Sequence, residues 1–572
     1  MRRKPEPKTG PGSICARLVP GGQTRTVPIL ARLEPLKTGA GLRVGSSVAP
    51  DPQFSTLEHS CLGYDTIFAR DRRETGWLHG LDFHPRIEMK KTENSSNSPL
   101  TSPLSRRRFL RGSACTAATF LVVPGAVLGL RGQTPPSNRL NIAGVGVGGQ
   151  GGADLASIMR ECPGENIVAL ADVDWRHAAG TFKRYPQAKP FKDFRKMLDE
   201  VKEIDAVVVA TPDHMHAFAS MAALARGKHV YCEKPLTHSV WEARQVTLAA
   251  RARKVATQMG NQGAGSEDTR RLCEIVWSGA IGPIREAHIW TDRPSQGLFN
   301  EYWPQGVGRP KDTPPVPEGL DWDLWLGPAP ERPYHPAYHP FRWRGWWDFG
   351  TGALGDIGCH AFDPVFRALK LSAPLSVQAS STRVNEETYP LGSMVTYHFP
   401  ARGPEIQANN PHVRGLSGRG AGELEMPALK LVWYDGGLRP PRPPELPDGE
   451  LMGDNGRLLI GERGFILGSR IYPESLRKEV ESQIPRSIPR VDGHYKDWVD
   501  ACKSGKPSGS NFDWAGPLAE TVLLGNIALR VQVRELLTRR KLEWDAANLK
   551  FTNLPEANEF IRRAYRQGWT LG

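Results

Sequence analysis

A lysine, an aspartate and a histidine are the side chains of this sequence best placed to do chemistry. Lys234 follows the apolar run His229–Cys232, in the tripeptide Glu233-Lys234-Pro235. Ligands of open α/β sheets bind at the carboxyl ends of the strands, so a lysine at that position predicts a contact with a reacting group. The structural alternative is a solvated lysine before a proline turn.

Asp356 and His360 are four residues apart in the segment DIGCH. If this segment is helical, both side chains project from one face of the helix. A histidine beside a carboxylate can accept a hydroxyl proton while hydride leaves the same carbon, and a cationic Lys234 can stabilise the oxyanion or relay the proton. The alternatives are a purely helix-stabilising pair and a metal-binding pair, and the second lacks an evident third ligand.

A glycine-rich turn, GVGVGG beginning at Gly144, contains G-x-G-x-x-G between a predicted strand and a predicted helix. Glycines let the backbone approach a pyrophosphate, and the helix N-terminus supplies N–H donors. Asp172 ends the next predicted strand 28 residues later, near the place of a carboxylate that accepts ribose hydroxyls. Such a carboxylate repels a 2′-phosphate and favours NAD, although Arg176 leaves NADP open.

A second strand-to-helix turn, TPDHMH from Thr211 to His216, follows the run AVVVA and belongs at the same sheet edge. Its two histidines have the spacing of a weak metal motif, but a turn whose backbone and Thr211 face the cofactor explains them better. We predict no metal site. The residues predicted at the cofactor are Gly144, Gly146, Gly149, Asp172, Thr211, Pro212, His216, Glu233 and Lys234.

Continuous apolar runs separated by amphipathic segments fill residues 138–260 and predict a doubly wound parallel sheet of the Rossmann type. The fold class expected is therefore α/β, and the function expected for this domain is NAD(P) binding. The strands predicted are 140–145, 167–171, 206–210, 229–232 and 255–259, with helices to about residue 160 and over 214–226 and 240–253.

The pattern changes after Gly260 and predicts a substrate-binding α+β domain over 261–565, with a large, mostly antiparallel open sheet. Residues 291–350 are loop-like and hold six of the sixteen tryptophans, between Trp303 and Trp347. They are either a carbohydrate-binding wall, buried anchors of the loop or an oligomer contact. The strands predicted are 284–290, 394–399, 429–434, 457–460 and 465–468, with helices over 266–278 and 518–537 and surface loops over 401–427 and 437–450.

Most of the net charge of +13 lies in the first 133 residues, which hold 20 Lys and Arg against 10 Asp and Glu. The remaining residues hold 54 against 51 and give little support to nucleic-acid binding. Residues 1–88 show no periodicity or motif, which predicts a disordered extension or a translation start near Met89. The cysteines are widely spaced without C-x-x-C, so they predict neither a disulfide framework nor a zinc site.

Residues 89–133 have the order of a twin-arginine export leader. The segment SRRRFLR beginning at Ser105 precedes an apolar stretch over 114–130 and a polar exit. Pro124 and glycines within the apolar stretch disfavour a stable membrane span, with a retained anchor as the alternative. We therefore predict an exported, periplasmic protein that has the twin-arginine export machinery as a partner.

The chain resembles the glucose–fructose oxidoreductase/inositol dehydrogenase/rhizopine catabolism (Gfo/Idh/MocA) family in GVGVGGQG, ALADVD, VVVATPDHMH, VYCEKPLTH and GALGDIGCH. EKP together with D-x-x-x-H is the specific part of this resemblance. It implies a Rossmann domain joined to an α+β domain and hydride transfer between NAD(P) and a sugar or polyol. It maps the family's catalytic lysine onto Lys234, and its aspartate and histidine, either of which serves as base in different members, onto Asp356 and His360.

An exported enzyme with a dinucleotide site needs a nicotinamide that stays bound, because free NAD is scarce outside the cytoplasm. We predict an NAD(P)-dependent oxidoreductase that acts on a hydroxyl of a sugar, polyol or glycoside. The alternative is a redox-assisted glycosidase, like the NAD-dependent α-N-acetylgalactosaminidases that resemble this family. A non-catalytic sugar or nucleotide binder, or an assembly protein, is the second alternative. We also expect a homo-oligomer that associates through the open sheet.

Overall fold

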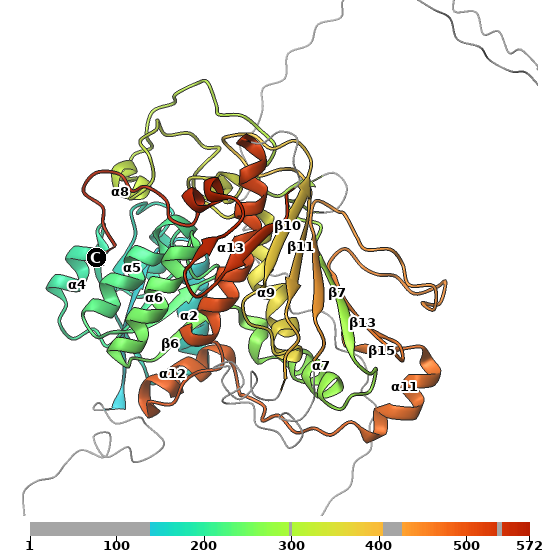
Figure 1. Cartoon of the computed structure of the whole chain (residues 1–572). Coiled ribbons are helices and arrows are strands. Elements are labelled where there is room, and N and C mark those ends of the chain that lie inside the picture. The colour runs from blue at the N-terminus through green and yellow to red at the C-terminus, as the bar shows by residue number, and fades with distance from the viewer. Residues whose placement is uncertain (1–137, 297–299, 404–425, 535–539, 572) are drawn as a thin grey trace, which may run out of the picture. The chain divides into compact units, whose positions relative to one another are not determined.

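The described part of the chain belongs to one unit, Leu104–Gly572. The segments predicted as an extension and as an export leader, 1–88 and 89–133, lie outside the described residues and stay predictions. No helix of the described part is long and apolar enough to cross a membrane. The computed structural model describes residues 138–296, 300–403, 426–534 and 540–571 (Figure 1).

A six-stranded parallel sheet forms from the apolar runs of the first domain. Its strand order is β3-β2-β1-β4-β5-β6, so the chain starts in the middle of the sheet and winds outward in both directions. The fold class predicted for this domain is confirmed; the short β3, whose sequence is KPF, was not predicted. The strands are β1 (Asn141–Val145), β2 (Asn166–Ala171), β3 (Lys189–Phe191), β4 (Ala206–Val209), β5 (His229–Glu233) and β6 (Thr257–Gly260).

Helices cover both faces of this sheet, because alternate residues of each buried strand point to opposite sides. Val207 and Val209 of β4 pack with α4, α5 and α6, whereas Val208 packs with α2. A helix from much later in the chain, α12 (His494–Ser504), joins α2 on that second face. The other helices are α2 (Gln150–Glu161), α3 (Ala179–Arg184), α4 (Phe194–Glu200), α5 (Asp213–Ala225) and α6 (Val240–Arg253).

The second domain is built on a nine-stranded sheet with the order β15-β14-β13-β7-β12-β11-β10-β16-β17. Its pairs are antiparallel except for β7 and β12, which run parallel. This confirms the mostly antiparallel sheet predicted from sequence. The strands are β7 (Ile284–Trp290), β10 (Ser376–Ser381), β11 (Ser393–Phe399), β12 (Leu429–Tyr434), β13 (Gly456–Gly461), β14 (Phe465–Leu467), β15 (Arg470–Tyr472), β16 (Leu542–Asp545) and β17 (Lys550–Phe551).

Three long helices pack on one face of the large sheet and separate it from the parallel sheet (Figure 1). They are α7 (Glu267–Trp277), α9 (Gly352–Ala368) and α13 (Phe512–Arg534). Helix α13 begins earlier than predicted because the Asn511 side chain accepts the backbone N–H of Asp513 at 3.0 Å. Smaller elements are α8 (Trp322–Leu326), α11 (Glu474–Val480), η3 (Gln262–Gly265), η4 (Arg342–Gly345), η5 (Glu481–Gln483) and η6 (Pro555–Phe560).

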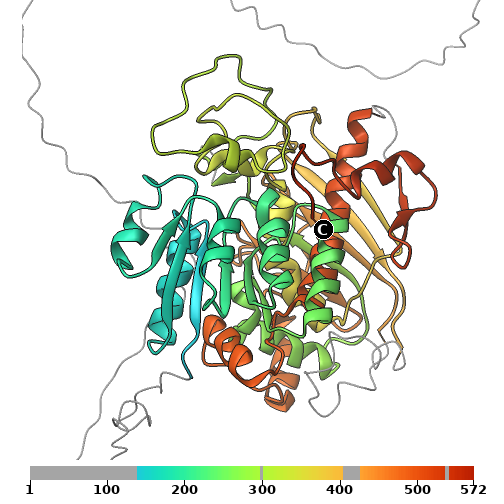
Figure 2. The same ribbon diagram turned by 90° about the vertical axis from the view of Figure 1, so that its left-hand side faces the viewer.

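The tryptophan-rich segment, residues 302–349, arches over the edge of the parallel sheet in both views (Figure 2). An isolated bridge joins Leu320 to Asp174, just beyond β2, and the backbone N–H of His214 donates to Phe349 O at 3.2 Å. The segment contains α8 and η4, and it follows the short hairpin of β8 (Ser295–Gln296) and β9 (Asn300–Glu301). It therefore places side chains of the second domain beside the ends of the parallel strands.

Candidate active site

The ammonium group of Lys234 forms an ion pair with Asp356 across the two domains. Lys234 directly follows β5, and Asp356 lies on α9. The distance from Lys234 Nζ to Asp356 Oδ1 is 2.9 Å, and the two side chains are only 14% and 7% exposed. The structure thus brings together two residues, 122 positions apart, that the sequence suggested separately.

His360 lies one helical turn after Asp356 on α9, as the i, i+4 spacing predicted for a helix. Among the residues that the structure describes, no hydrogen bond reaches the His360 ring. Burial and the nearby charge of Lys234 lower the pKa of His360 to about 3, so the imidazole is neutral at physiological pH. A neutral, unengaged imidazole can accept a proton from a bound molecule.

Arg344, which sequence analysis did not select, supplies a second cation to the same carboxylate. Its Nε donates to Asp356 Oδ1 at 3.1 Å. The guanidinium carbon lies 4.0 Å from the ring centre of Phe341 and 4.3 Å from that of Trp343. No sequence motif marks this arginine, because its contact depends on how the tryptophan-rich segment folds back over α9.

The two cations determine the protonation states of the cluster. Burial opposes ionisation of Asp356, yet the charges of Lys234 and Arg344 outweigh it and hold the pKa of Asp356 far below its usual range. Burial also opposes the charge on Lys234, but the Asp356 carboxylate raises the pKa of Lys234 above its usual value. Both groups therefore stay ionised at neutral pH, and His360 does not.

The glycine-rich turn has the shape of a phosphate cradle. Gly146 has φ of +78°, and a Cβ on it would lie 2.7 Å from the backbone nitrogen of Thr211, so only glycine fits. Gly144 lies in β1, and Gly149 directly precedes α2, where a side chain would meet only His177 at 3.6 Å. Backbone N–H groups before a helix N-terminus favour an anion at this turn.

Asp172 contacts the turn through its carboxylate. Its Oδ2 accepts from the backbone N–H groups of Val147 and Gly148 at 2.7 and 2.9 Å, and its Oδ1 accepts from that of Asp174 at 2.8 Å. Burial raises the pKa of Asp172 to about 6, against these hydrogen bonds. The carboxylate therefore lies between the glycine-rich turn after β1 and the end of β2, where it could accept hydrogen bonds from the hydroxyls of a ribose. The side chain of Arg176 is exposed, and its Nε lies 3.8 Å from Asp174 Oδ1.

The turn from Thr211 to His216 lies at the same edge, but its histidines are fully engaged. His216 contacts Pro235 O at 2.7 Å and Thr211 O at 2.8 Å, and so ties this turn to the one after Lys234. His214 contacts Trp325 O at 2.9 Å. The Thr211 hydroxyl is buried without a partner in the described chain, which suits a residue that faces a bound cofactor. Pro212 precedes α5 and fixes its start.

A further buried carboxyl group, Asp213, was missed by sequence analysis. It is 1% exposed, and its Oδ2 accepts from the Thr351 hydroxyl at 2.6 Å, just before α9. Burial raises the pKa of Asp213 to about 7. A first-turn aspartate on a helix is ordinarily a surface residue, so only the packing of α9 against α5 distinguishes this one.

Glu233 forms hydrogen bonds with groups other than Asp356. Its Oε1 accepts from the Tyr231 hydroxyl at 3.2 Å and from Gln262 Nε2 at 2.8 Å, and its Oε2 accepts from the Lys234 backbone N–H at 3.3 Å. Burial raises the pKa of Glu233 to about 7, although the charge of Lys234 opposes this. The carboxyl group thus supports the backbone of the lysine and does not itself contact Asp356.

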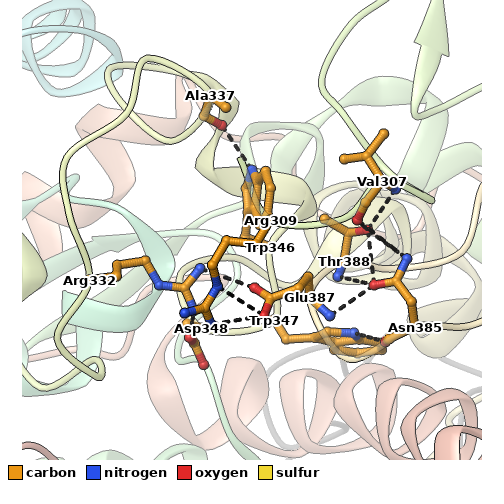
Figure 3. A network of polar contacts seen from close by, with 10 residues as sticks. All are labelled: Val307, Arg309, Arg332, Ala337, Trp346, Trp347, Asp348, Asn385, Glu387 and Thr388. Carbon is orange, nitrogen blue, oxygen red and sulfur yellow. Dashed lines mark hydrogen bonds and ion pairs between the residues drawn. The ribbon is translucent and has the colours of Figure 1, made fainter. Parts of the chain in front are cut away.

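Most of the tryptophans between 302 and 349 are buried, which favours the interpretation that they anchor the segment. Trp303 is 0% exposed, and Trp346 is 1% exposed with its Nε1 donating to Ala337 O at 2.8 Å. Figure 3 shows the polar network that includes Trp346 and Trp347, in which Arg332 forms ion pairs with Asp348 and Glu387. This network holds the segment rigidly, and with it Arg344.

Two segments of the chain match models of one protein family. Residues 140–261 match the oxidoreductase family with an NAD-binding Rossmann fold, and residues 294–407 match the C-terminal alpha/beta domain of that family. Both segments are therefore similar to domains of the Gfo/Idh/MocA oxidoreductases. The second match includes Arg344, Asp356 and His360, and the first confirms the predicted NAD-binding domain.

Curated relatives match mainly through the NAD-binding domain. Inositol 2-dehydrogenase of Rubrobacter xylanophilus is 35% identical over 147 residues, which cover 26% of this chain and 42% of that protein. Levoglucosan dehydrogenase of Pseudarthrobacter phenanthrenivorans is 24% identical over 201 residues, which cover 35% of this chain and 41% of that protein. The chain thus spans about two fifths of the length of these relatives.

Solved structures align over a larger part of the chain at lower identity. Levoglucosan dehydrogenase in complex with NADH and levoglucosan has a TM-score of 0.44 and 16% identity, covering 71% of this chain and 99% of that chain. WlbA dehydrogenase of Bordetella pertussis in complex with NADH and UDP-GlcNAcA has a TM-score of 0.45 and 14% identity, covering 71% and 99%.

Proposed function

We propose that the protein transfers hydride between a hydroxyl-bearing carbon of a sugar, polyol or glycoside and a nicotinamide cofactor. The ion pair between Lys234 and Asp356 carries this proposal, because it joins the NAD-binding sheet to the helix that also bears His360. An isolated buried ion pair contributes little to stability, so its retention beside a cofactor edge favours a chemical role. A non-catalytic binder or an assembly protein has no need for it.

Each of the three side chains has a role that follows from its protonation state. Lys234 stays charged and stabilises the negative oxygen that develops as the hydroxyl loses its proton. Asp356 stays ionised and orients Lys234 through the 2.9 Å contact. Asp356 Oδ1 already accepts from Lys234 and Arg344, whereas no hydrogen bond reaches the neutral His360 ring in the described chain, so His360 accepts the hydroxyl proton.

The residues at the glycine turn fit NAD. The backbone around Gly146 and the N-terminus of α2 would hold the pyrophosphate, and Asp172 would accept the hydroxyls of the adenosine ribose. The unpaired Thr211 hydroxyl lies at the same edge. When bound, the nicotinamide accepts or returns the hydride, and the residues of this chain move the proton.

We further propose that the cofactor remains bound from one turnover to the next and that the protein works outside the cytoplasm. The twin-arginine pattern at Ser105 supports export. A retained cofactor then makes the redox cycle closed: hydride returns to a second sugar or, after an elimination, to the same one. Association of copies through the open face of the large sheet belongs to this proposal as well.

The proposal is tested by purifying the full chain without added nucleotide and following nicotinamide absorbance while sugars, polyols and glycosides are added. Lys234→Ala should reduce turnover by about 100-fold or more, since it removes the charge that stabilises the oxyanion. Lys228→Ala is the matched control and should leave turnover unchanged, because this half-buried lysine lies at the other end of β5 and its Nζ donates to Lys202 O at 3.3 Å. Turnover that survives Lys234→Ala would contradict the proposed chemistry. A purified protein that contains no bound nucleotide would contradict retention of the cofactor.

A further inference from the structure

The charged cluster of the candidate site contains one more cation than anion. Lys234 and Arg344 both donate to a single oxygen, Asp356 Oδ1, at 2.9 and 3.1 Å. The side chains of Lys234, Asp356 and Arg344 are 14%, 7% and 17% exposed. Charges withdrawn from water to this extent are stabilised only when they are balanced, so a net positive cluster favours the arrival of an anion.

The neighbouring carboxyl groups compensate only part of this excess charge. Asp213 Oδ2 accepts from the Thr351 hydroxyl and forms no ion pair with the cluster in the described chain, and burial raises the pKa of Asp213 to about 7. Glu233 accepts from Tyr231 and Gln262, and burial raises its pKa to about 7 as well. Each carboxyl is therefore about half protonated at neutral pH, and a bound oxidised nicotinamide adds a further positive charge at this edge.

Arg344 has a donor available for such an anion. Its Nε binds Asp356 and its Nη1 donates to Phe341 O at 3.0 Å, whereas Nη2 makes no hydrogen bond to any described residue. The rings of Phe341 and Trp343 hold the plane of the guanidinium at 4.0 and 4.3 Å. A planar, fixed guanidinium beside an ammonium group is the arrangement that recognises a carboxylate or phosphate oxygen pair.

We propose that Arg344 forms, with Lys234, a binding subsite for the carboxylate of an acidic sugar, close to the hydroxyl that the site oxidises. This inference rests on the proposed function and narrows its substrate class from sugars in general to sugar acids. The carboxylate completes a balanced set of two cations and two anions. The network around Arg332 keeps Arg344 in place for it, because that network anchors the segment on which Arg344 lies (Figure 3).

A different use of the excess charge is stabilisation of the developing oxyanion alone. In that case neutral and acidic sugars of the same configuration would react equally well. The ratio of kcat/KM for the acidic sugar to kcat/KM for the neutral sugar distinguishes a carboxylate subsite from stabilisation of the oxyanion alone. A substitution that damages the site in general lowers both values and leaves this ratio unchanged.

The experiment compares hexuronates with the matching hexoses, glucuronate with glucose and galacturonate with galactose, as substrates of the full chain. The wild type should prefer one hexuronate by about 10- to 100-fold in kcat/KM, mainly through KM, the range of a charged hydrogen bond. Arg344→Gln should bring that ratio close to one, and Arg344→Lys should recover part of it. Arg342→Gln is the matched control, since Arg342 is exposed and pairs with Glu301 at 3.0 Å, and the ratio should not change.

A wild-type ratio near one, or a ratio that Arg344→Gln leaves unchanged, would overturn the proposed carboxylate subsite. Neither result would contradict the proposed oxidoreductase function. If no sugar is turned over, the thermal shift caused by hexuronate and by hexose decides the matter in the same variants. Stabilisation by hexuronate that is lost in Arg344→Gln supports the subsite even when the proposed reaction fails, and equal or absent stabilisation overturns it.

Discussion

Replacing Asp356 by asparagine tests the charge arrangement of the site most directly. The substitution keeps the size of the side chain but removes the only carboxylate that forms ion pairs with Lys234 and Arg344 in the described chain. Two cations then face each other in a site that is 7–17% exposed. Removing one partner from a buried ion pair costs about 3–5 kcal/mol, because the remaining charge is left uncompensated.

The pH dependence of this loss has a defined sign. In the wild type, Asp356 raises the pKa of Lys234 against burial. Without it, burial and the charge of Arg344 both lower that pKa below its unfolded value. A lysine whose folded pKa is depressed makes the protein less stable as the pH falls from the unfolded pKa of the lysine toward its folded pKa. The deficit of Asp356→Asn relative to the wild type should therefore be larger at pH 7 than at pH 10.

Thermal unfolding of both proteins at the two pH values measures this deficit. Asp363→Asn is a matched control on the same helix, where a buried carboxylate pairs with Arg367 at 2.9 and 3.0 Å. Asp363→Asn should also lower stability but should keep most of the turnover, whereas Asp356→Asn should lose about 100-fold or more. Adding Arg344→Gln to Asp356→Asn should restore part of the lost stability. Equal melting temperatures for the wild type and Asp356→Asn at pH 7 would refute the reasoning.

Three further predictions follow from single positions. Gly146→Ala should abolish nucleotide binding, measured by calorimetry with NAD, because a Cβ would lie 2.7 Å from Thr211 N at a φ of +78°; unaltered affinity would contradict the proposed cradle. Asp213→Asn should stabilise the protein increasingly from about pH 4 to about pH 7, by at most about 4 kcal/mol, because burial raises the folded pKa of Asp213 from the ordinary value of 3.8 to about 7. The wild-type protein becomes less stable as the buried Asp213 carboxyl ionises, whereas asparagine does not ionise. A difference in melting temperature that does not depend on pH would contradict this explanation. Trp346→Ala should destabilise by about 3–5 kcal/mol in thermal unfolding, since the ring is 1% exposed, and a loss under about 1 kcal/mol would show that the segment is not anchored there.

Local sequence patterns determined the parallel sheet and the order of its elements. Strands β1, β2, β4, β5 and β6 and helices α2, α5 and α6 were predicted because buried parallel strands are continuous apolar runs that alternate with amphipathic helices, whereas α3, α4 and β3 were not predicted. Strands β3 and β10, which are among the strands that escaped prediction, show the limit of this signal. Strand β3 is only KPF, and β10 has the sequence SVQASS, in which few residues are apolar. Their pairing with β2 and β11 decides their conformation.

The candidate residues were predictable for the same reason, and their partners were not. Lys234 follows an apolar strand, and Asp356 and His360 have helical spacing, so each was visible in a short segment. Arg344 and Asp213 have no such signal. Their roles depend on burial and on contacts with α9, which lies in a different part of the chain from β5 and α5.

The sequence by itself thus determined which residue types stand at the ends of which strands and helices, because backbone periodicity is a local property. The tertiary structure decided which charges meet. It placed a second cation, Arg344, on the carboxylate of Asp356, left His360 without a partner in the described chain, and buried the tryptophans that sequence analysis considered for a carbohydrate-binding wall. Electrostatic balance and burial depend on distances between remote segments, so no local pattern could reveal them.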